Sequence, residues 1–71
     1  MLKISYKQRK LLEFIKIFYD ANEFMPTIHE MARYQEVNIL LVHRRIYSLE
    51  CKGYLKRQKN VARGIVLTKK L

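Results

Sequence analysis

Apolar residues recur at intervals of three and four along the first part of the chain, which is the spacing of one face of an α-helix. This face consists of Leu11, Leu12, Ile15, Phe18 and Tyr19. Ahead of it, Ser5 and Gln8 stand three residues apart, so a hydroxyl and an amide can satisfy the free N–H groups of a helix start. The pattern predicts a helix over residues 6–22.

A second capping pair, Thr27 and Glu30, stands directly after Pro26. Proline keeps the residue before it extended, so a new helix is expected to begin just beyond it. The apolar face that follows is short and consists of Ile28, Met31 and Ala32. We therefore expect a brief helix over residues 28–34.

A third helix is predicted over residues 38–52, because Asn38 is a good N-cap and Gly53 tolerates the positive φ of a helix end. The side expected to face the core carries Val42, Ile46 and Leu49. The opposite side carries Leu40, His43, Arg44, Tyr47 and Cys51. Arg45 lies at the flank of the core side, where its stem can pack while its head reaches water or phosphate.

Beyond Gly53, short runs of apolar and basic residues surround a turn region at 59–64. This pattern predicts a β-hairpin with strands at 54–58 and 65–68 and a basic tip. Three helices followed by a two-stranded hairpin form an α+β fold, the winged helix-turn-helix. We expect one such domain over residues 1–71.

The charge of the chain indicates its partners. Fifteen Lys and Arg residues against six Asp and Glu residues give +9 in only 71 residues. Nucleic acid is the commonest acidic partner of so basic a domain, and an anionic membrane surface is the second candidate. The apolar runs are too short to span a bilayer, and no signal-peptide pattern opens the chain. A single cysteine, Cys51, forms no internal disulfide and fits a reducing compartment, so we expect a cytoplasmic, nucleoid-associated protein without a membrane partner.

Four segments resemble a known family in their order and spacing. "KQRKLLEFI", "PTIHEMA", "LECKGYLKR" and "RGIVLT" are similar to the N-terminal DNA-binding domain of the LexA repressor family, and the resemblance covers nearly the whole chain. The matching positions are Gln8, Leu12, Phe14, Ile15, Pro26, Thr27, Glu30, Ala32, Leu49, Glu50, Lys52, Gly53, Tyr54, Arg63, Gly64, Ile65 and Leu67. The resemblance implies a winged helix that binds duplex DNA as a transcriptional repressor.

The chain departs from the family in three places. It ends at Leu71 and carries no counterpart of the self-cleaving, dimerising domain with its Ser–Lys dyad, so no autocleavage is expected. The turn between the second and third helices, "YQEVN", lacks the usual Leu-Gly and is one residue shorter. His43 and Arg44 stand where two acids would be expected. A different operator is therefore expected.

The candidate DNA contacts fall into two groups. In helix-turn-helix proteins the early residues of the second helix of the motif meet base edges. The third-helix candidates are Asn38, Leu40, Leu41, His43, Arg44 and Tyr47. Arginine can bind guanine O6 and N7 together, and leucine can cover a thymine methyl. The candidates for the DNA backbone or minor groove are Thr27, Arg45, Lys56, Arg57, Lys59 and Arg63.

Other roles remain open for several of these residues. Leu40 or Leu41 would be a core residue if the third helix were rotated, and Tyr47 and His43 could be ordinary surface residues. The hairpin cations could serve to keep a sheet edge soluble. An apolar outward face of the third helix would also suit a protein partner, so a co-repressor that acts on a larger regulator is the alternative function. On DNA, the protein would act as a homodimer or beside that regulator.

Enzymatic and metal chemistry are not expected. His43 and Cys51 are eight positions apart on one helix, a rise of roughly 12 Å, so they cannot share a metal ion. One Cys and two His residues fall short of a structural zinc set, and no activated-nucleophile pattern is present. No cofactor is expected. The setting that we favour is a small stand-alone repressor of the phage or mobile-element type.

Overall fold

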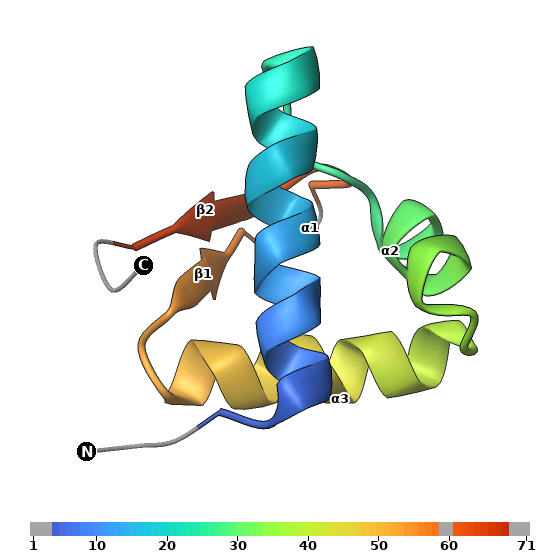
Figure 1. Ribbon diagram of the computed structural model, residues 1–71. Helices are drawn as coiled ribbons and strands as arrows, with labels where there is room; N and C mark the ends of the chain where they lie inside the picture. Colours follow the sequence, from blue (N-terminus) through green and yellow to red (C-terminus); the bar gives the residue numbers. More distant parts are fainter. Residues whose placement is uncertain (1–3, 59–60, 69–71) are drawn as a thin grey trace.

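The computed structural model of the protein describes residues 4–58 and 61–68 (Figure 1). Within these residues the elements are α1 (Tyr6–Asn22), α2 (Ile28–Gln35), α3 (Ile39–Cys51), β1 (Leu55–Arg57) and β2 (Ile65–Leu67). The two strands form an antiparallel hairpin, so the predicted winged helix-turn-helix plan is confirmed. The second helix ends one residue later than predicted, and both strands are shorter than predicted.

All three predicted N-caps are present. The Ser5 hydroxyl accepts from the Gln8 N–H at 3.1 Å, and the Gln8 side chain accepts in return from the Ser5 N–H at 3.1 Å. Thr27 and Glu30 form the same reciprocal box, with bonds of 3.1 and 2.7 Å. The Asn38 side chain accepts from the Leu41 N–H at 2.8 Å. Each such cap stabilises a helix by about 0.5–2 kcal/mol, so these caps fix the starts of the helices.

The turn between α2 and α3 closes without a glycine. Glu36 adopts the left-handed conformation with φ 57°, and its N–H donates to Arg33 while the Val37 N–H donates to Ala32. Gly53 ends α3 in the same way with φ 84°. A non-glycine residue in this region costs roughly 1–2 kcal/mol. The turn therefore keeps the helix-turn-helix geometry without a glycine, at a local cost in backbone energy.

Every element contributes to one apolar core. The buried hydrophobic residues are Leu11, Leu12, Ile15, Met31, Ala32, Val42, Ile46, Leu49, Leu55 and Ile65. Tyr19, the last residue of the predicted apolar face of α1, is 46% exposed and lies outside this core. The last turns of α1 extend beyond the other helices and the strands (Figure 1).

The hairpin, which we call the wing, is held to the body at its base. Leu55 pairs with Leu67 and Arg57 with Ile65, and both Leu55 and Ile65 are buried. Tyr54, predicted as a strand residue, instead completes the end of α3, where its N–H donates to Leu49. At Gly64 a Cβ would lie 2.9 Å from the carbonyl oxygens of Gln58 and Val61, so the returning strand needs glycine there.

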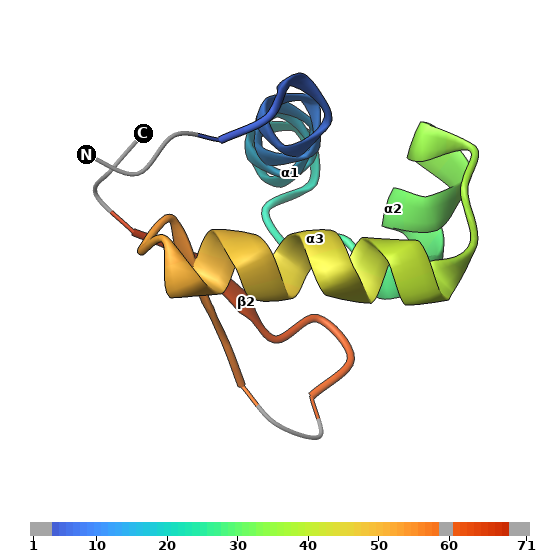
Figure 2. The ribbon, with the colours of Figure 1, turned by 90° about the horizontal axis from the view of Figure 1, so that it is seen from below.

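The three helices and the wing leave one side of α3 uncovered. Figure 2 shows α3 across the front of the molecule, with α1 on one side of it and the wing on the other. In Figure 1, α3 lies at the N-terminal end of α1, so this uncovered side points along the axis of α1 and away from its body. No helix in the described part of the chain is long and apolar enough to cross a membrane.

Candidate nucleic-acid interface

The outward side of α3 carries the predicted reading residues. Leu40 is 63% exposed and Tyr47 61% exposed, and His43 and Arg44 lie between them on the same exposed side. The guanidinium of Arg44 makes no hydrogen bond or ion pair with any residue that the structure describes. Arg44 is therefore a cation at the centre of an exposed helix face, with its five N–H donors available.

The two leucines of this helix differ in their positions. Leu40 points outward, whereas Leu41 is half-buried and its N–H is occupied by the cap from Asn38. Neither leucine is fully buried, because the core contacts of α3 are made by Val42, Ile46 and Leu49. The rotated helix that would bury one of the leucines completely is thus not observed. Leu40 is the better placed of the two for an external contact.

Tyr47 keeps its phenolic proton in this environment. Interaction with the Cys51 side chain, one turn further along α3, raises the pKa of the Tyr47 hydroxyl, and the nearby Glu50 charge acts in the same direction. A protonated phenol can donate a hydrogen bond to a phosphate oxygen. The outward face therefore ends in a neutral donor rather than an anion.

His43 and Glu50 connect α3 to the wing through Arg57. The Arg57 Nη1 lies 3.2 Å from the His43 Nδ1, and the Arg57 Nε lies 3.7 Å from a Glu50 carboxylate oxygen. The Arg57 main-chain N–H also donates to Glu50 at 3.4 Å. These contacts hold the Arg57 guanidinium beside the reading face, so the two predicted groups of DNA contacts meet at this point.

A cavity of about 450 Å³ lies between α3 and the wing. Its apolar floor is formed by Ile28, Met31 and Ile65, and His43, Glu50 and Arg57 stand among its polar lining residues. Beyond the packed base of the wing, where Leu55 and Ile65 are buried, the wing therefore contacts α3 through the polar side chains of His43, Glu50 and Arg57.

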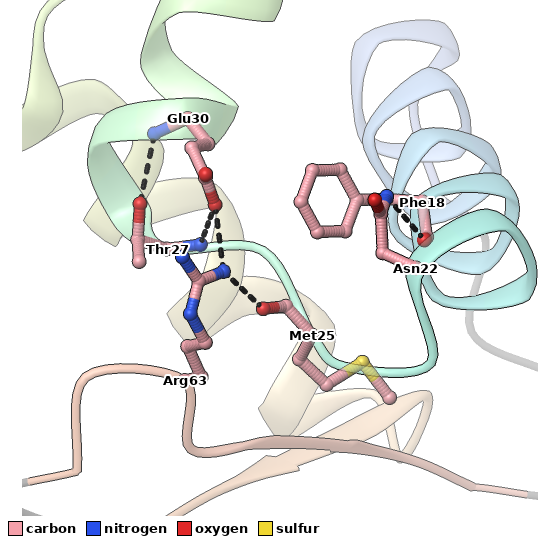
Figure 3. Close-up of polar contacts among 6 residues, drawn as sticks. All are labelled: Phe18, Asn22, Met25, Thr27, Glu30 and Arg63. Atoms are coloured by element: carbon pink, nitrogen blue, oxygen red, sulfur yellow. Dashed lines mark hydrogen bonds and ion pairs between the residues drawn. The ribbon is translucent and has the colours of Figure 1, made fainter.

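Arg63 does not join this group. Its Nη1 donates to the Met25 carbonyl at 2.8 Å and to the Glu30 carboxylate at 3.0 Å, as Figure 3 shows. Its guanidinium also lies 4.5 Å from the centre of the Phe24 ring. Thr27, another predicted backbone contact, belongs to the same cluster because its hydroxyl caps Glu30. Arg63 thus fastens the wing to the start of α2, and Thr27 caps the helix at that point.

The Glu30 carboxylate is the centre of that cluster. It accepts from the Thr27 N–H and from Arg63, and these contacts hold the pKa of Glu30 below its usual value of 4.5. Near this cluster, the Asn22 side chain donates to the Phe18 carbonyl at 2.9 Å in the last turn of α1 (Figure 3). The spacing of Thr27 and Glu30 predicted a helix cap, but no local pattern indicates that Glu30 pairs with Arg63.

Two glutamines hold α3 in its orientation, and sequence reasoning missed this role for both. Gln35 donates to the Lys7 carbonyl at 3.0 Å and accepts from Arg45 at 2.6 Å. Gln8 donates to the Ser48 hydroxyl at 2.9 Å and accepts from Lys52 at 3.0 Å. The head of Arg45 is therefore bound to α2 rather than directed outward. The three-residue spacing between Ser5 and Gln8 predicted the helix cap but not the contacts of Gln8 with α3.

Two predicted wing cations remain. Lys56 is exposed on β1, opposite Val66 in the hairpin. Lys59 lies outside the described residues.

Comparison with known proteins gives consistent matches. Residues 1–64 match the family model described as the LexA DNA binding domain. The LexA repressor of Thermosipho melanesiensis is 34% identical over 70 residues, which cover 99% of this chain and 35% of that protein. LexA repressor 2 of Geobacter sulfurreducens is 41% identical over 69 residues, which cover 96% of this chain and 34% of that protein. The chain thus spans about a third of the length of these curated relatives.

Proposed function

Because the chain belongs to the family of LexA DNA-binding domains, we propose that it binds double-stranded DNA sequence-specifically and represses transcription. The observation that carries this proposal is the outward face of α3, where Arg44 is exposed between Leu40 and Tyr47 and Arg57 is held alongside. In the proposed complex α3 lies in the major groove, as the second helix of such motifs does.

The roles on α3 follow from the chemistry of each side chain. Arg44 reads a guanine through O6 and N7, and Leu40 covers a thymine methyl. The Tyr47 hydroxyl donates to a phosphate, and Asn38 presents the N-terminus of α3 to another phosphate. His43 supports the reading face through its contact with Arg57. Leu41 shapes the inner border of this face because it is half-buried.

The remaining candidate residues either contact the DNA backbone or stabilise the fold of the domain. Lys56 and Arg57 on the wing, with Lys59, are the proposed phosphate or minor-groove contacts. Arg45, Arg63 and Thr27 have a supporting role in this proposal, because their polar groups are bound to Gln35, Met25 and Glu30. The net charge of +9 adds a sequence-independent attraction to any duplex.

We propose that the 71 residues act as one DNA-binding unit without catalytic activity, in the cytoplasm and on the nucleoid. A second candidate function is a co-repressor that binds a larger regulator. The observation that favours it is the exposure of Ile39, Leu40 and Tyr47, which is 41, 63 and 61% respectively. Such apolar exposure on one helix face suits a protein partner.

One experiment separates these functions. Fragments of the source genome are footprinted with the protein at a fixed salt concentration, and the preferred site is then titrated beside a random duplex of equal length. Sequence-specific binding is expected to be tighter on the preferred site by about 10³-fold or more. Equal affinity for both duplexes would exclude base reading. A protein contact that survives loss of DNA binding would establish the co-repressor function.

A further inference from the structure

The contact between His43 and Arg57 determines which ring nitrogen of His43 carries the proton. The Arg57 Nη1 lies 3.2 Å from the His43 Nδ1. A guanidinium can only donate, so Nδ1 is the acceptor in this contact and the imidazole is neutral. A neutral imidazole has one acceptor and one donor nitrogen. The proton of His43 therefore lies on the other nitrogen, Nε2.

Arg57 is itself held in position by α3. A Glu50 carboxylate oxygen lies 3.7 Å from the Arg57 Nε, and Glu50 also accepts from the Arg57 main-chain N–H at 3.4 Å. His43 and Glu50 are seven positions apart on α3, about two helical turns, so both lie on the side of the helix that faces the wing. Glu50 thus orients Arg57, and Arg57 orients the ring of His43.

The protonated nitrogen of His43 is available for an external contact. Among residues 4–58 and 61–68, which the structure describes, none bonds to the His43 Nε2. The side chain is exposed and directly precedes Arg44 on α3. We propose that the Nε2–H group of His43 reads a guanine N7 in the operator, with Arg57 and Glu50 as positioning residues. This inference rests on the proposed binding of duplex DNA.

The fixed proton decides which bases His43 can recognise. In the major groove guanine presents two acceptors, N7 and O6, whereas adenine and thymine each present one acceptor and cytosine presents a donor. A donor nitrogen at His43 cannot bond to the cytosine amino group, and guanine offers it the most acceptors. Arg44 is also a donor only. The two neighbouring residues therefore select acceptors, where a pair of carboxylates would select donors.

The position of the proton is tested without DNA. Long-range ¹H–¹⁵N NMR spectra at about pH 8, above the range in which histidine ordinarily charges, are expected to show His43 as a single Nε2–H tautomer. His29, exposed on α2 and without a bond to any described residue, is the internal control and is expected to populate both tautomers. Arg57→Ala should make the His43 ring resemble the His29 ring. An Nδ1–H tautomer of His43, or a ring unaffected by Arg57→Ala, would overturn the proposal.

The base contact is tested by changing the guanines of the preferred site, one at a time, to 7-deazaguanine, which lacks the N7 acceptor. One such change is expected to weaken binding of the wild type about three- to tenfold. The same change should weaken Arg44→Ala similarly but have no further effect in His43→Ala. His29→Ala should respond as the wild type does. Specific binding without any guanine that depends on His43 would overturn this inference alone, whereas equal binding of all duplexes would overturn the proposed function as well.

Glu50→Ala separates positioning from charge. It removes a negative charge beside the DNA, so charge alone predicts tighter binding to every duplex. Positioning predicts in addition that the loss caused by 7-deazaguanine becomes smaller in Glu50→Ala and in Arg57→Ala. Circular dichroism confirms the fold of each variant. A loss of equal size in the wild type and in both variants would show that Arg57 and Glu50 do not position His43, and would overturn the proposal.

Discussion

At the scale of single residues, Arg44 is expected to distinguish one base pair from another. Its guanidinium is exposed and makes no polar contact with any described residue, so all of its N–H donors are available to DNA. Arg44→Ala should cost about 1–3 kcal/mol on the preferred site and relax the preference at one base position. The measurement is a titration of the variant against the preferred and a random duplex at several salt concentrations.

Lys56→Ala is the matched control for Arg44→Ala. Lys56 is an exposed wing cation, so its loss should weaken both duplexes by similar factors and flatten the salt slope by about one phosphate contact. If Arg44→Ala also weakened both duplexes equally, Arg44 would be a backbone contact. Base reading would then have to come from Asn38, Leu40 or His43.

The left-handed Glu36 offers a stabilising substitution. Glu36→Gly relieves a conformation that costs a non-glycine residue roughly 1–2 kcal/mol, but glycine loses more entropy on folding. We expect a net gain of about 0.5–1 kcal/mol in the free energy of unfolding, measured in urea. Gly53→Ala, at the equivalent position after α3, should destabilise by about 1–2 kcal/mol. If Glu36→Gly instead lowered the free energy of unfolding, the Glu36 side chain would stabilise the fold by more than its left-handed backbone destabilises it.

Glu30 should make stability depend on pH in the acid range. Its pKa is lowered in the folded protein, so its contribution is complete above the ordinary value of 4.5 and is lost as pH falls through the lower folded value. Thermal unfolding is therefore expected to become easier below about pH 4.5, more steeply in the wild type than in Glu30→Gln. Parallel pH profiles for the two proteins would mean that the charge of Glu30, in its contacts with the Thr27 N–H and with Arg63, has no energetic weight.

At the scale of the elements, the orientation of α3 depends on its connection to α2. Gln35 joins the two helices through Arg45 and reaches the first turn of α1 through the Lys7 carbonyl. A double-mutant cycle of Gln35→Ala and Arg45→Ala is expected to give a coupling free energy of about 0.5–1.5 kcal/mol, since the bond is charged but only partly buried. If the two free-energy changes were additive, and if Arg45→Ala also reduced the salt slope of DNA binding, Arg45 would be a contact to the DNA backbone instead.

The elements themselves could be predicted because their signals are local. Ser5, Thr27 and Asn38 cap the helix that follows each of them, and Gly53 ends α3 through its own backbone freedom. The partners of Arg45 and Arg63 could not be predicted in this way. Arg63 meets Glu30 across 33 positions of the chain, so only the packing of the wing against α2 brings them together. Charge and exposure suggested DNA contact for both arginines, but neither signal identifies a neighbour in space.

At the scale of the whole molecule, exposed cations lie on the reading face and the wing, and two exposed acids lie at the far end of α1. The reading face and the wing carry Arg44, Lys56 and Arg57, whereas Asp20 and Glu23 lie at the far end of α1. The two acids nearest to the wing, Glu30 and Glu50, are bound to Arg63 and Arg57. The domain is therefore expected to approach a duplex with α3 and the wing first.

The position of α3 at the N-terminal end of α1 decides which part of the domain stays far from a bound duplex. The uncovered side of α3 points along the axis of α1 and away from its body, so the C-terminal end of α1 points away from DNA that is held against α3 (Figure 1). Asp20 is exposed in the last turn of α1. A charge change at Asp20 is therefore expected to alter the affinity for a duplex less than a charge change at Lys56 does, because salt screens charges over about 10 Å. Titration of Asp20→Ala and Lys56→Ala at one salt concentration measures this difference, and equal effects would mean that DNA reaches the far end of α1.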